Sequence, residues 1–191
     1  MTELTYIALT ALCTLIIALT AIVTAIFQTR FSRKAMGADV AFRLEEKFYH
    51  TELFREIRTG AARELMMVQE KKKEPGRLPN FESLADFFEF IGALHEDGAL
   101  SSDICWNSFY RRAFAYWSFA EELGVISTQR ALRPTRWISY EHMLNDLAKT
   151  QFSKSRSVIG KEEITDLMAR EQDLSIPARM EEYASDSAIK H

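Results

Sequence analysis

An uncharged stretch near the N-terminus constrains this chain more than any other feature. From Leu4 to Thr29 no residue is charged over 26 positions. A helix that rises about 1.5 Å per residue would reach about 39 Å over this stretch, which exceeds the roughly 30 Å of a bilayer's hydrocarbon core. A core helix of a soluble domain would be shorter and would carry polar residues on one face. The sequence therefore predicts a single transmembrane helix.

The flanks of this stretch predict its orientation. Met1-Thr2-Glu3 in front is acidic, whereas Arg30, Arg33 and Lys34 follow as a basic collar at the membrane surface. Arg and Lys residues that flank a membrane helix favour the cytoplasmic side of the membrane. We therefore expect a single-pass protein of the inner (plasma) membrane, with its N-terminus outside and the rest in the cytoplasm. The alternative is a cleaved signal peptide, which would need bases in front and a shorter apolar run.

Small residues recur every three or four positions within the apolar stretch. They form a packing seam of heptad spacing, which we call the small-residue seam: Ala11, Thr14, Ala18, Ala21 and Ala25. Helices associate in lipid through close approach at small residues. The spacing therefore predicts a second transmembrane helix as partner, either a copy of this chain or another protein; a chance rhythm is the alternative.

Helical spacing recurs throughout the rest of the chain, and strand alternation does not persist, so the fold class is predicted as all-α. We divide the chain into an anchor with its collar (1–34), a small cytoplasmic helical bundle (35–152) and a charged, loosely ordered tail (153–191). The first bundle helix is expected to continue from the membrane helix, with Gly37 as a weak point and a break near Thr51. Within the tail, residues 160–172 could form a short helix that nothing obliges to pack.

Two segments predict the core of the bundle. The helix starting at Asn80, which we expect to cap it, and ending before Gly98 is apolar on two sides, as expected of a central helix. The following segment, 101–123, is rich in aromatic residues. The predicted core residues are Phe81, Phe88, Ile91, Trp106, Tyr116 and Trp117. The alternatives are a haem site and a stacking platform for nucleobases, which would need exposed rings beside a basic groove, and we expect these rings to be buried in the core instead.

Acidic residues on the central helix share one face, the acidic ribbon: Glu82, Asp86, Glu89 and Glu96. We expect this ribbon to face water or to pair with Arg111 and Arg112. A metal site is the alternative, but Glu-x-x-His and His-Glu-x-x-His motifs are absent from the sequence.

No motif predicts catalysis. Glycine-rich phosphate loops and nucleophile elbows are missing. Cys105 could act as a nucleophile only beside a base such as His95, and we expect a buried thiol instead. Cys13 lies in the apolar stretch, so no internal disulfide is expected. We predict no catalytic residue, no cofactor and no metal.

The apolar helix, the basic collar and the segment "LADFFEFIGALHEDGALSSDICWNSFYRRAFAYW" together resemble a bacterial family that is known only as a domain of unknown function. The resemblance spans roughly residues 1–150. It rests most specifically on Phe88, Glu89, Gly92, Gly98 and Tyr116-Trp117. It implies a single-pass membrane protein with a small helical cytoplasmic domain, and it implies no activity.

Three hypotheses of function follow. The first is a non-enzymatic, membrane-anchored scaffold or accessory subunit that holds a cytoplasmic protein partner. The second is a sensor or effector of the stress or phage-defence type, whose bundle controls the assembly of the membrane helix. The third is an enzyme whose motif is not recognised. Expected partners are membrane lipid, another transmembrane helix and a cytoplasmic protein, with no nucleic acid.

Overall fold

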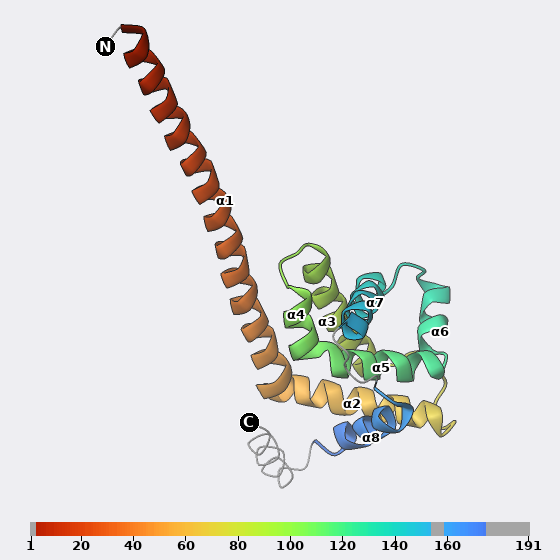
Figure 1. Ribbon diagram of the computed structural model, residues 1–191. Coiled ribbons are helices and arrows are strands. Elements are labelled where there is room, and N and C mark those ends of the chain that lie inside the picture. The colour runs from red at the N-terminus through yellow and green to blue at the C-terminus, as the bar shows by residue number, and fades with distance from the viewer. Residues whose placement is uncertain (1–2, 154–158, 175–191) are drawn as a thin grey trace.

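The computed structural model describes residues 3–153 and 159–174, and these residues contain helices and no strand (Figure 1). The predicted all-α fold is confirmed. The elements in chain order are α1 (Glu3–His50), α2 (Glu52–Gln69), α3 (Pro79–Glu96), α4 (Ser102–Cys105), the π-helical η1 (Trp106–Tyr110), α5 (Arg111–Glu122), α6 (Val125–Leu132), α7 (Ile138–Ser153) and α8 (Lys161–Gln172). Within these helices, the structure does not describe the side chains of residues 3–16, 26, 29–34 and 150–153.

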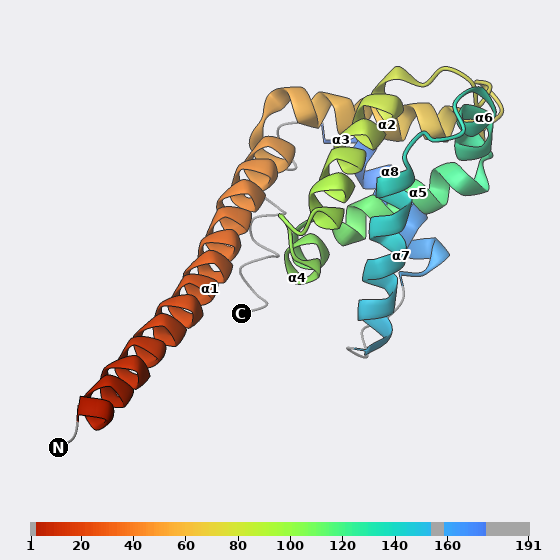
Figure 2. The same ribbon diagram turned by 90° about the horizontal axis from the view of Figure 1, so that it is seen from above.

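Helix α1 is one long rod whose N-terminal half extends away from the other helices (Figures 1 and 2). Its 48 residues correspond to about 72 Å. The helix continues through Gly37, so this glycine is not the weak point that we expected. A Cβ at this position would collide with the carbonyl oxygen of Ala99, and the glycine therefore lets α1 lie against the loop that follows α3.

The break between α1 and α2 falls at Thr51, as predicted. The Thr51 hydroxyl donates to the carbonyl of Lys47 at 2.6 Å and accepts from the N–H of Phe54 at 3.4 Å. It thus satisfies one free carbonyl at the end of α1 and one free N–H at the start of α2. Just before this break, Phe48 of α1 is fully buried and stacks on Phe87 of α3 with 5.3 Å between ring centroids. The C-terminal end of α1 is therefore part of the core.

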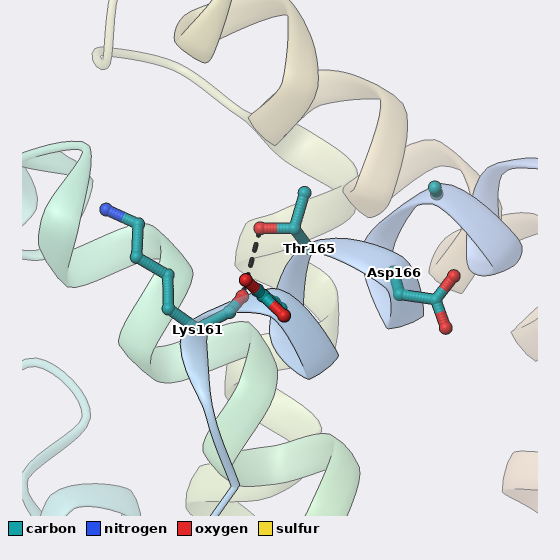
Figure 3. A pocket seen from close by; sticks show the side chains of 5 residues that line it. Lys161, Thr165 and Asp166 are labelled. Atoms are coloured by element: carbon teal, nitrogen blue, oxygen red, sulfur yellow. Dashed lines mark hydrogen bonds between the residues drawn. The ribbon is translucent and has the colours of Figure 1, made fainter.

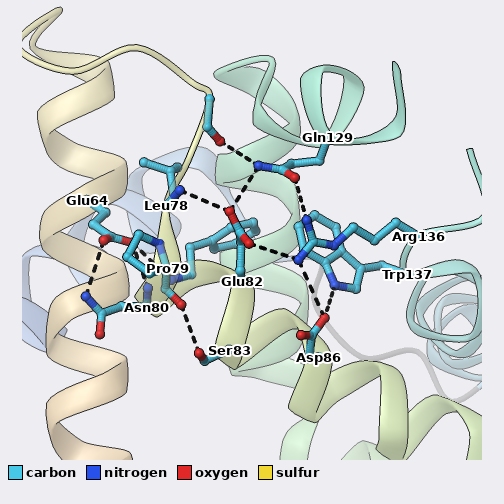
Figure 4. Close-up of polar contacts among 12 residues, drawn as sticks. Glu64, Leu78, Pro79, Asn80, Glu82, Ser83, Asp86, Gln129, Arg136 and Trp137 are labelled. Carbon is cyan, nitrogen blue, oxygen red and sulfur yellow. Dashed lines mark hydrogen bonds and ion pairs between the residues drawn. The ribbon is translucent and has the colours of Figure 1, made fainter. Parts of the chain in front are cut away.

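Helix α3 is central, as its two apolar faces predicted, but it is capped differently from the expectation. It begins at Pro79, one residue before the predicted cap Asn80. The carboxylate of Glu64, on α2, accepts from the backbone N–H groups of Asn80 and Phe81 at 3.1 Å each (Figure 4). A charged acceptor from a neighbouring helix thus serves the first turn of α3.

The aromatic segment forms three consecutive elements, α4, η1 and α5, where we expected one helix. Its start is capped by Ser101, whose hydroxyl accepts from the N–H of Ile104 at 3.4 Å. Five of the six predicted core residues are buried: Phe81, Phe88, Ile91, Tyr116 and Trp117. The sixth, Trp106, is half-buried and stacks on Tyr110 at 4.1 Å between centroids.

Two further helices complete the bundle: α6, which was not expected, and α8, which is the short helix expected within residues 160–172 but packs where no packing was predicted. Helix α6 follows Gly124, which has a φ of 72°, and was not expected. Helix α8 lies within the stretch for which we predicted a loosely ordered tail. Its side chains Ile164, Met168 and Glu171 are buried, and the helix packs against α2 and α5 (Figure 1). The bundle therefore extends past residue 152.

Candidate functional site

The acidic ribbon of α3 contacts α7 and the turn before it, and two of its side chains, Asp86 and Glu96, are also exposed to water. The Glu82 carboxylate accepts from the Arg136 guanidinium at 3.0 Å and from the backbone N–H of Leu78 at 3.2 Å (Figure 4). Partial burial raises the pKa of Glu82, but these hydrogen bonds and the charge of Arg136 outweigh it and hold the pKa below its usual value. The carboxylate is therefore ionised and committed to a structural contact.

The rest of the ribbon holds the start of α7. Glu89 accepts from the backbone N–H groups of Ser139 at 3.3 Å and Tyr140 at 2.7 Å. The indole N–H of Trp137 donates to Asp86 at 2.7 Å, and the Ser139 hydroxyl donates to Glu96 at 2.7 Å. These carboxylates thus serve α7 and its preceding turn, a role that the sequence did not predict, whereas the exposure of Asp86 and Glu96 and the pairing of Glu82 with an arginine agree with the expectation.

Arg111 and Arg112 do not pair with the ribbon, contrary to our expectation. Arg111 contacts Glu163 at 2.7 Å, and Arg112 contacts Glu171 at 2.9 Å, both on α8. The basic partner of the ribbon is Arg136, in the turn before α7. Both arginines contact α8, which packs against α5 and which the sequence did not predict to pack.

The thiol of Cys105 is fully buried, as predicted, and burial raises its pKa to about 12. A thiol with such a pKa is protonated near neutral pH and is a poor nucleophile. The ring of His95 contacts the carbonyl of Leu100 at 3.2 Å through Nδ1 and the carboxylate of Asp146 at 2.9 Å through Nε2. The imidazole therefore has partners other than the thiol.

Over residues 3–153 and 159–174, no group of three His, Cys, Asp or Glu side chains is arranged to hold a metal ion. This finding concerns the described residues alone.

A charged cluster that the sequence did not indicate lies where α1, α2, α5 and α8 meet. We call it the arginine cluster: Tyr49, Arg58, Arg112, Tyr116 and Glu171. The Glu171 carboxylate accepts from Nε of Arg112 at 2.9 Å and lies 3.6 Å from Nε of Arg58. Nη1 of Arg112 donates to the Tyr49 hydroxyl at 3.1 Å, and that hydroxyl donates to the carbonyl of Ser108 at 2.7 Å.

Burial sets the electrostatics of this cluster. The side chains of Arg58 and Glu171 are each only 5% exposed. Burial lowers the pKa of Arg112, but Tyr49 and Glu171 outweigh that effect and raise the pKa above its usual value. Burial and the negative charge of Glu171 raise the pKa of Tyr116, whose hydroxyl donates to the carbonyl of Arg58 at 3.0 Å. Arg112 is therefore charged, and the phenol of Tyr116 keeps its proton and can donate a hydrogen bond, at neutral pH.

The arginine cluster borders a cavity of about 230 Å³. Its lining residues are Tyr49, Arg58, Arg111, Arg112, Glu163, Asp166, Leu167, Arg170, Glu171 and Leu174. A second hollow on the outer face of α8 is lined by Lys161, Glu162, Thr165, Asp166 and Ala169 (Figure 3). There the Thr165 hydroxyl donates to the carbonyl of Lys161 at 3.1 Å, which is an ordinary contact within a helix. The first cavity is the better candidate for a ligand because two of its charged groups, Arg58 and Glu171, are buried.

The predicted membrane segment lies on the N-terminal half of α1. Its described side chains from Ile17 to Gln28 are all exposed, including Ile17 and Phe27 at 69% each. Of the small-residue seam, Ala18, Ala21 and Ala25 are described and exposed. The side chains of Ala11 and Thr14, and those of the basic collar at Arg30, Arg33 and Lys34, lie outside the described residues.

Among the residues that the structure describes, no helix is both long enough and apolar enough to cross a bilayer. The transmembrane helix predicted for residues 4–29 is therefore not supported by the described part of α1.

One family model matches the chain, over residues 8–147: DUF4760, a domain of unknown function. The match covers well over half of the chain. The chain belongs to the DUF4760 family. The DUF4760 match includes Tyr49, Arg58 and Arg112 of the arginine cluster and ends before α8, which contributes Glu171. No curated protein matches the chain, and no solved structure matches it.

Proposed function

We propose that this protein is a membrane-anchored, non-enzymatic scaffold or accessory subunit, in which the N-terminal half of α1 crosses the inner membrane and the bundle binds a protein partner on the cytoplasmic face. The observation that carries the proposal is the exposure of apolar side chains on α1, from Ile17 to Phe27, in a helix that extends away from its own bundle (Figure 1).

The distribution of these side chains around the helix supports a lipid environment. At about 100° per residue, Leu19, Val23 and Phe27 lie on one side of α1, whereas Ile17 and Ile22 point in other directions. All five are exposed. A helix that is apolar all round is buried in a protein or in a membrane. Since α1 projects from the bundle, lipid is the environment that would cover these side chains.

The alanines of the small-residue seam lie together on the remaining side. Ala18, Ala21 and Ala25 fall within about 60° of one another at the same angular step. This separation from Leu19 and Val23 supports a second helix in close contact with the small residues, with the branched side chains toward lipid. The partner helix belongs to a copy of this chain or to another membrane protein.

The charges that flank the apolar stretch support the orientation. Arg30, Arg33 and Lys34 follow it, and Glu3 precedes it. Bases on the bundle side favour a cytoplasmic bundle. They also place three positive charges where anionic headgroups would attract them.

The continuity of α1 supports a second candidate function, that of a sensor or effector. The helix runs without a break from the apolar stretch to Phe48 in the core, and Gly37 brings it against the loop at Ala99. A tilt or rotation of the membrane half would therefore reach the bundle without a flexible linker to absorb it.

Extraction of membranes tests the anchor. We expect the full chain to stay in the membrane pellet after an alkaline carbonate wash. A double variant, Leu19→Arg with Ile22→Arg, should move to the soluble fraction, because each Arg costs about 2.5–3.5 kcal/mol at the centre of a membrane helix. Leu132→Arg serves as the control, since Leu132 is an exposed apolar residue of the bundle. Release of the unaltered chain by carbonate, or equal retention of the double variant, would contradict the proposal.

A further inference from the structure

We infer that the cavity beside the arginine cluster binds a small oxyanion, namely a phosphate group, held by Arg58 and Arg112. The inference is independent of where the protein resides, because the cavity is formed by α1, α2, α5 and α8 within the bundle.

The first argument is the balance of buried charge. Arg58 and Arg112 are two cations that share one carboxylate, Glu171, at 3.6 Å and 2.9 Å. Both Arg58 and Glu171 are 95% covered by protein, since their side chains are 5% exposed. Buried charges are ordinarily paired, because an unpaired charge in a low-dielectric site is costly. The group around Glu171 carries an excess of one positive charge that an anion would neutralise.

The remaining charges of the cavity do not change this balance. Arg111 contacts Glu163 at 2.7 Å, and Arg170 contacts Asp166 at 2.7 Å. These pairs are half-exposed and each has a net charge of zero. The four arginines and three carboxylates that line the cavity therefore leave the same excess of one positive charge.

The second argument is an incomplete set of hydrogen bonds. Nε and Nη1 of Arg58 are buried and have no hydrogen-bond partner among the described residues. Most buried polar atoms of native proteins have one. The 3.6 Å contact with Glu171 leaves Nε of Arg58 without a hydrogen bond, and an anion in the cavity would offer acceptors that the described residues do not.

The third argument is that both arginines are held in place before any ligand arrives. The guanidinium carbon of Arg58 lies 4.9 Å from the ring centroid of Phe48, and that of Arg112 lies 4.7 Å from the ring centroid of Tyr49. The Tyr49 hydroxyl is fixed in turn by Ser108. A pre-organised guanidinium loses little entropy when it binds an oxyanion.

Size and geometry favour phosphate. The cavity of about 230 Å³ is below the roughly 300–1,000 Å³ of sites for drug-sized ligands. The planar fork of arginine matches the oxygens of phosphate and forms short, charge-assisted hydrogen bonds with them. The phosphate is either free inorganic phosphate or the phosphate group of a small metabolite.

Calorimetry with inorganic phosphate tests the inference on the full chain in a phosphate-free detergent, at constant ionic strength set with chloride. We expect saturable binding and a rise of the thermal midpoint with phosphate. Arg112→Gln and Arg58→Met should each weaken binding at least tenfold. Arg43→Gln should bind as the unaltered chain does, because Arg43 pairs with Asp39 on the surface of α1, away from the cavity.

Arg58→Met keeps the length of the side chain and removes the buried charge, so without phosphate it should be at least as stable as the unaltered chain. If it fails to fold, Arg112→Gln alone decides. Glycerol 3-phosphate that binds like phosphate would support a metabolite as ligand, and selective binding of inorganic phosphate would support the free ion. The inference would be overturned if phosphate has no effect beyond that of chloride or if acetate binds more tightly than phosphate. It would also be overturned if both cluster variants bind phosphate as the unaltered chain does.

Discussion

The Glu89 carboxylate on α3 accepts a 2.7 Å hydrogen bond from the backbone N–H of Tyr140, in the first turn of α7. It also accepts from the N–H of Ser139 at 3.3 Å. The α3 helix thereby caps α7, just as Glu64 of α2 caps α3. Each carboxylate joins two helices that are neighbours in space and serves N–H groups that have no partner within their own helix.

Removal of the charge at Glu89 tests this relationship. Glu89→Gln should lower the free energy of unfolding by about 1–2 kcal/mol, because a charged acceptor at a helix start is replaced by a neutral one. Urea unfolding of the full chain in detergent, followed by tryptophan fluorescence, reports on the bundle, where all three tryptophans lie. Glu121→Gln, at an exposed position of α5, should change the value by less than about 0.5 kcal/mol. Equal effects of the two variants would show that Glu89 does not cap α7.

The two tryptophans of the aromatic segment should differ in their contribution. Trp117 is 6% exposed and packs edge-on against Tyr140 at 4.8 Å between centroids. Trp117→Ala should cost about 3–5 kcal/mol, as expected when a large ring leaves the core. Trp106→Ala, at the half-buried position, should cost roughly 1–2 kcal/mol. The same unfolding measurement decides, and a larger cost at Trp106 would contradict the burial seen here.

Alkaline pH should destabilise the bundle. Burial raises the pKa of Tyr140 well above its usual value, and burial and Glu171 do the same for Tyr116. The unfolded chain loses these phenolic protons near pH 10 and the folded chain keeps them, so stability is complete below about pH 10 and falls as the pH rises. Each phenol should contribute a slope of about 1.4 kcal/mol per pH unit.

Tyr140→Phe separates the contribution of one phenol. The variant should lose about 1 kcal/mol at neutral pH, because the hydroxyl donates to the carbonyl of Ala113 at 2.6 Å. Above about pH 10, the fall of its unfolding free energy with pH should be shallower by about 1.4 kcal/mol per pH unit, the contribution of one phenol. Unfolding free energies measured from pH 8 to 11 provide the test, and an unaltered slope would show that Tyr140 titrates alike in both states.

Branched side chains should disrupt the small-residue seam. Ala18→Ile and Ala21→Ile add bulk where a second helix would approach, whereas Leu19→Ile changes shape on the other side of α1. All three should insert equally, since each keeps or raises apolarity. Cross-linking in native bilayers should fall for the two alanine variants and remain level for Leu19→Ile. Equal cross-linking of all three would mean that the spacing of small residues is accidental.

The sequence predicted the local features of the fold because they depend on neighbours along the chain. The break at Thr51, the central role of α3 and the glycine after it follow from capping chemistry and 3.6-residue periodicity. Gly98 indeed has a φ of 71°. Helix α6 escaped notice because it is only eight residues long.

The contacts of charged residues could not be predicted in this way. The spacing of Glu82, Asp86 and Glu89 showed that they share a face but not that α7 covers it. The arginine cluster brings together Tyr49 and Glu171, which are far apart in the sequence, and nothing in their spacing indicates that they meet. Helix α8 has few apolar residues, and it contacts the bundle through the buried side chains of Ile164 and Met168 and through the ion pair of Glu171 with Arg112.

The most direct test of the membrane-anchored scaffold is the position of the C-terminus. With a tag placed after His191, protease added outside intact cells should leave the tag uncleaved, and the same protease should remove it in inverted membrane vesicles. This result follows from an anchored α1 with Arg30, Arg33 and Lys34 on the cytoplasmic side. Loss of the tag in intact cells would reverse the orientation, and recovery of the tagged chain outside the membrane fraction would contradict the anchor itself.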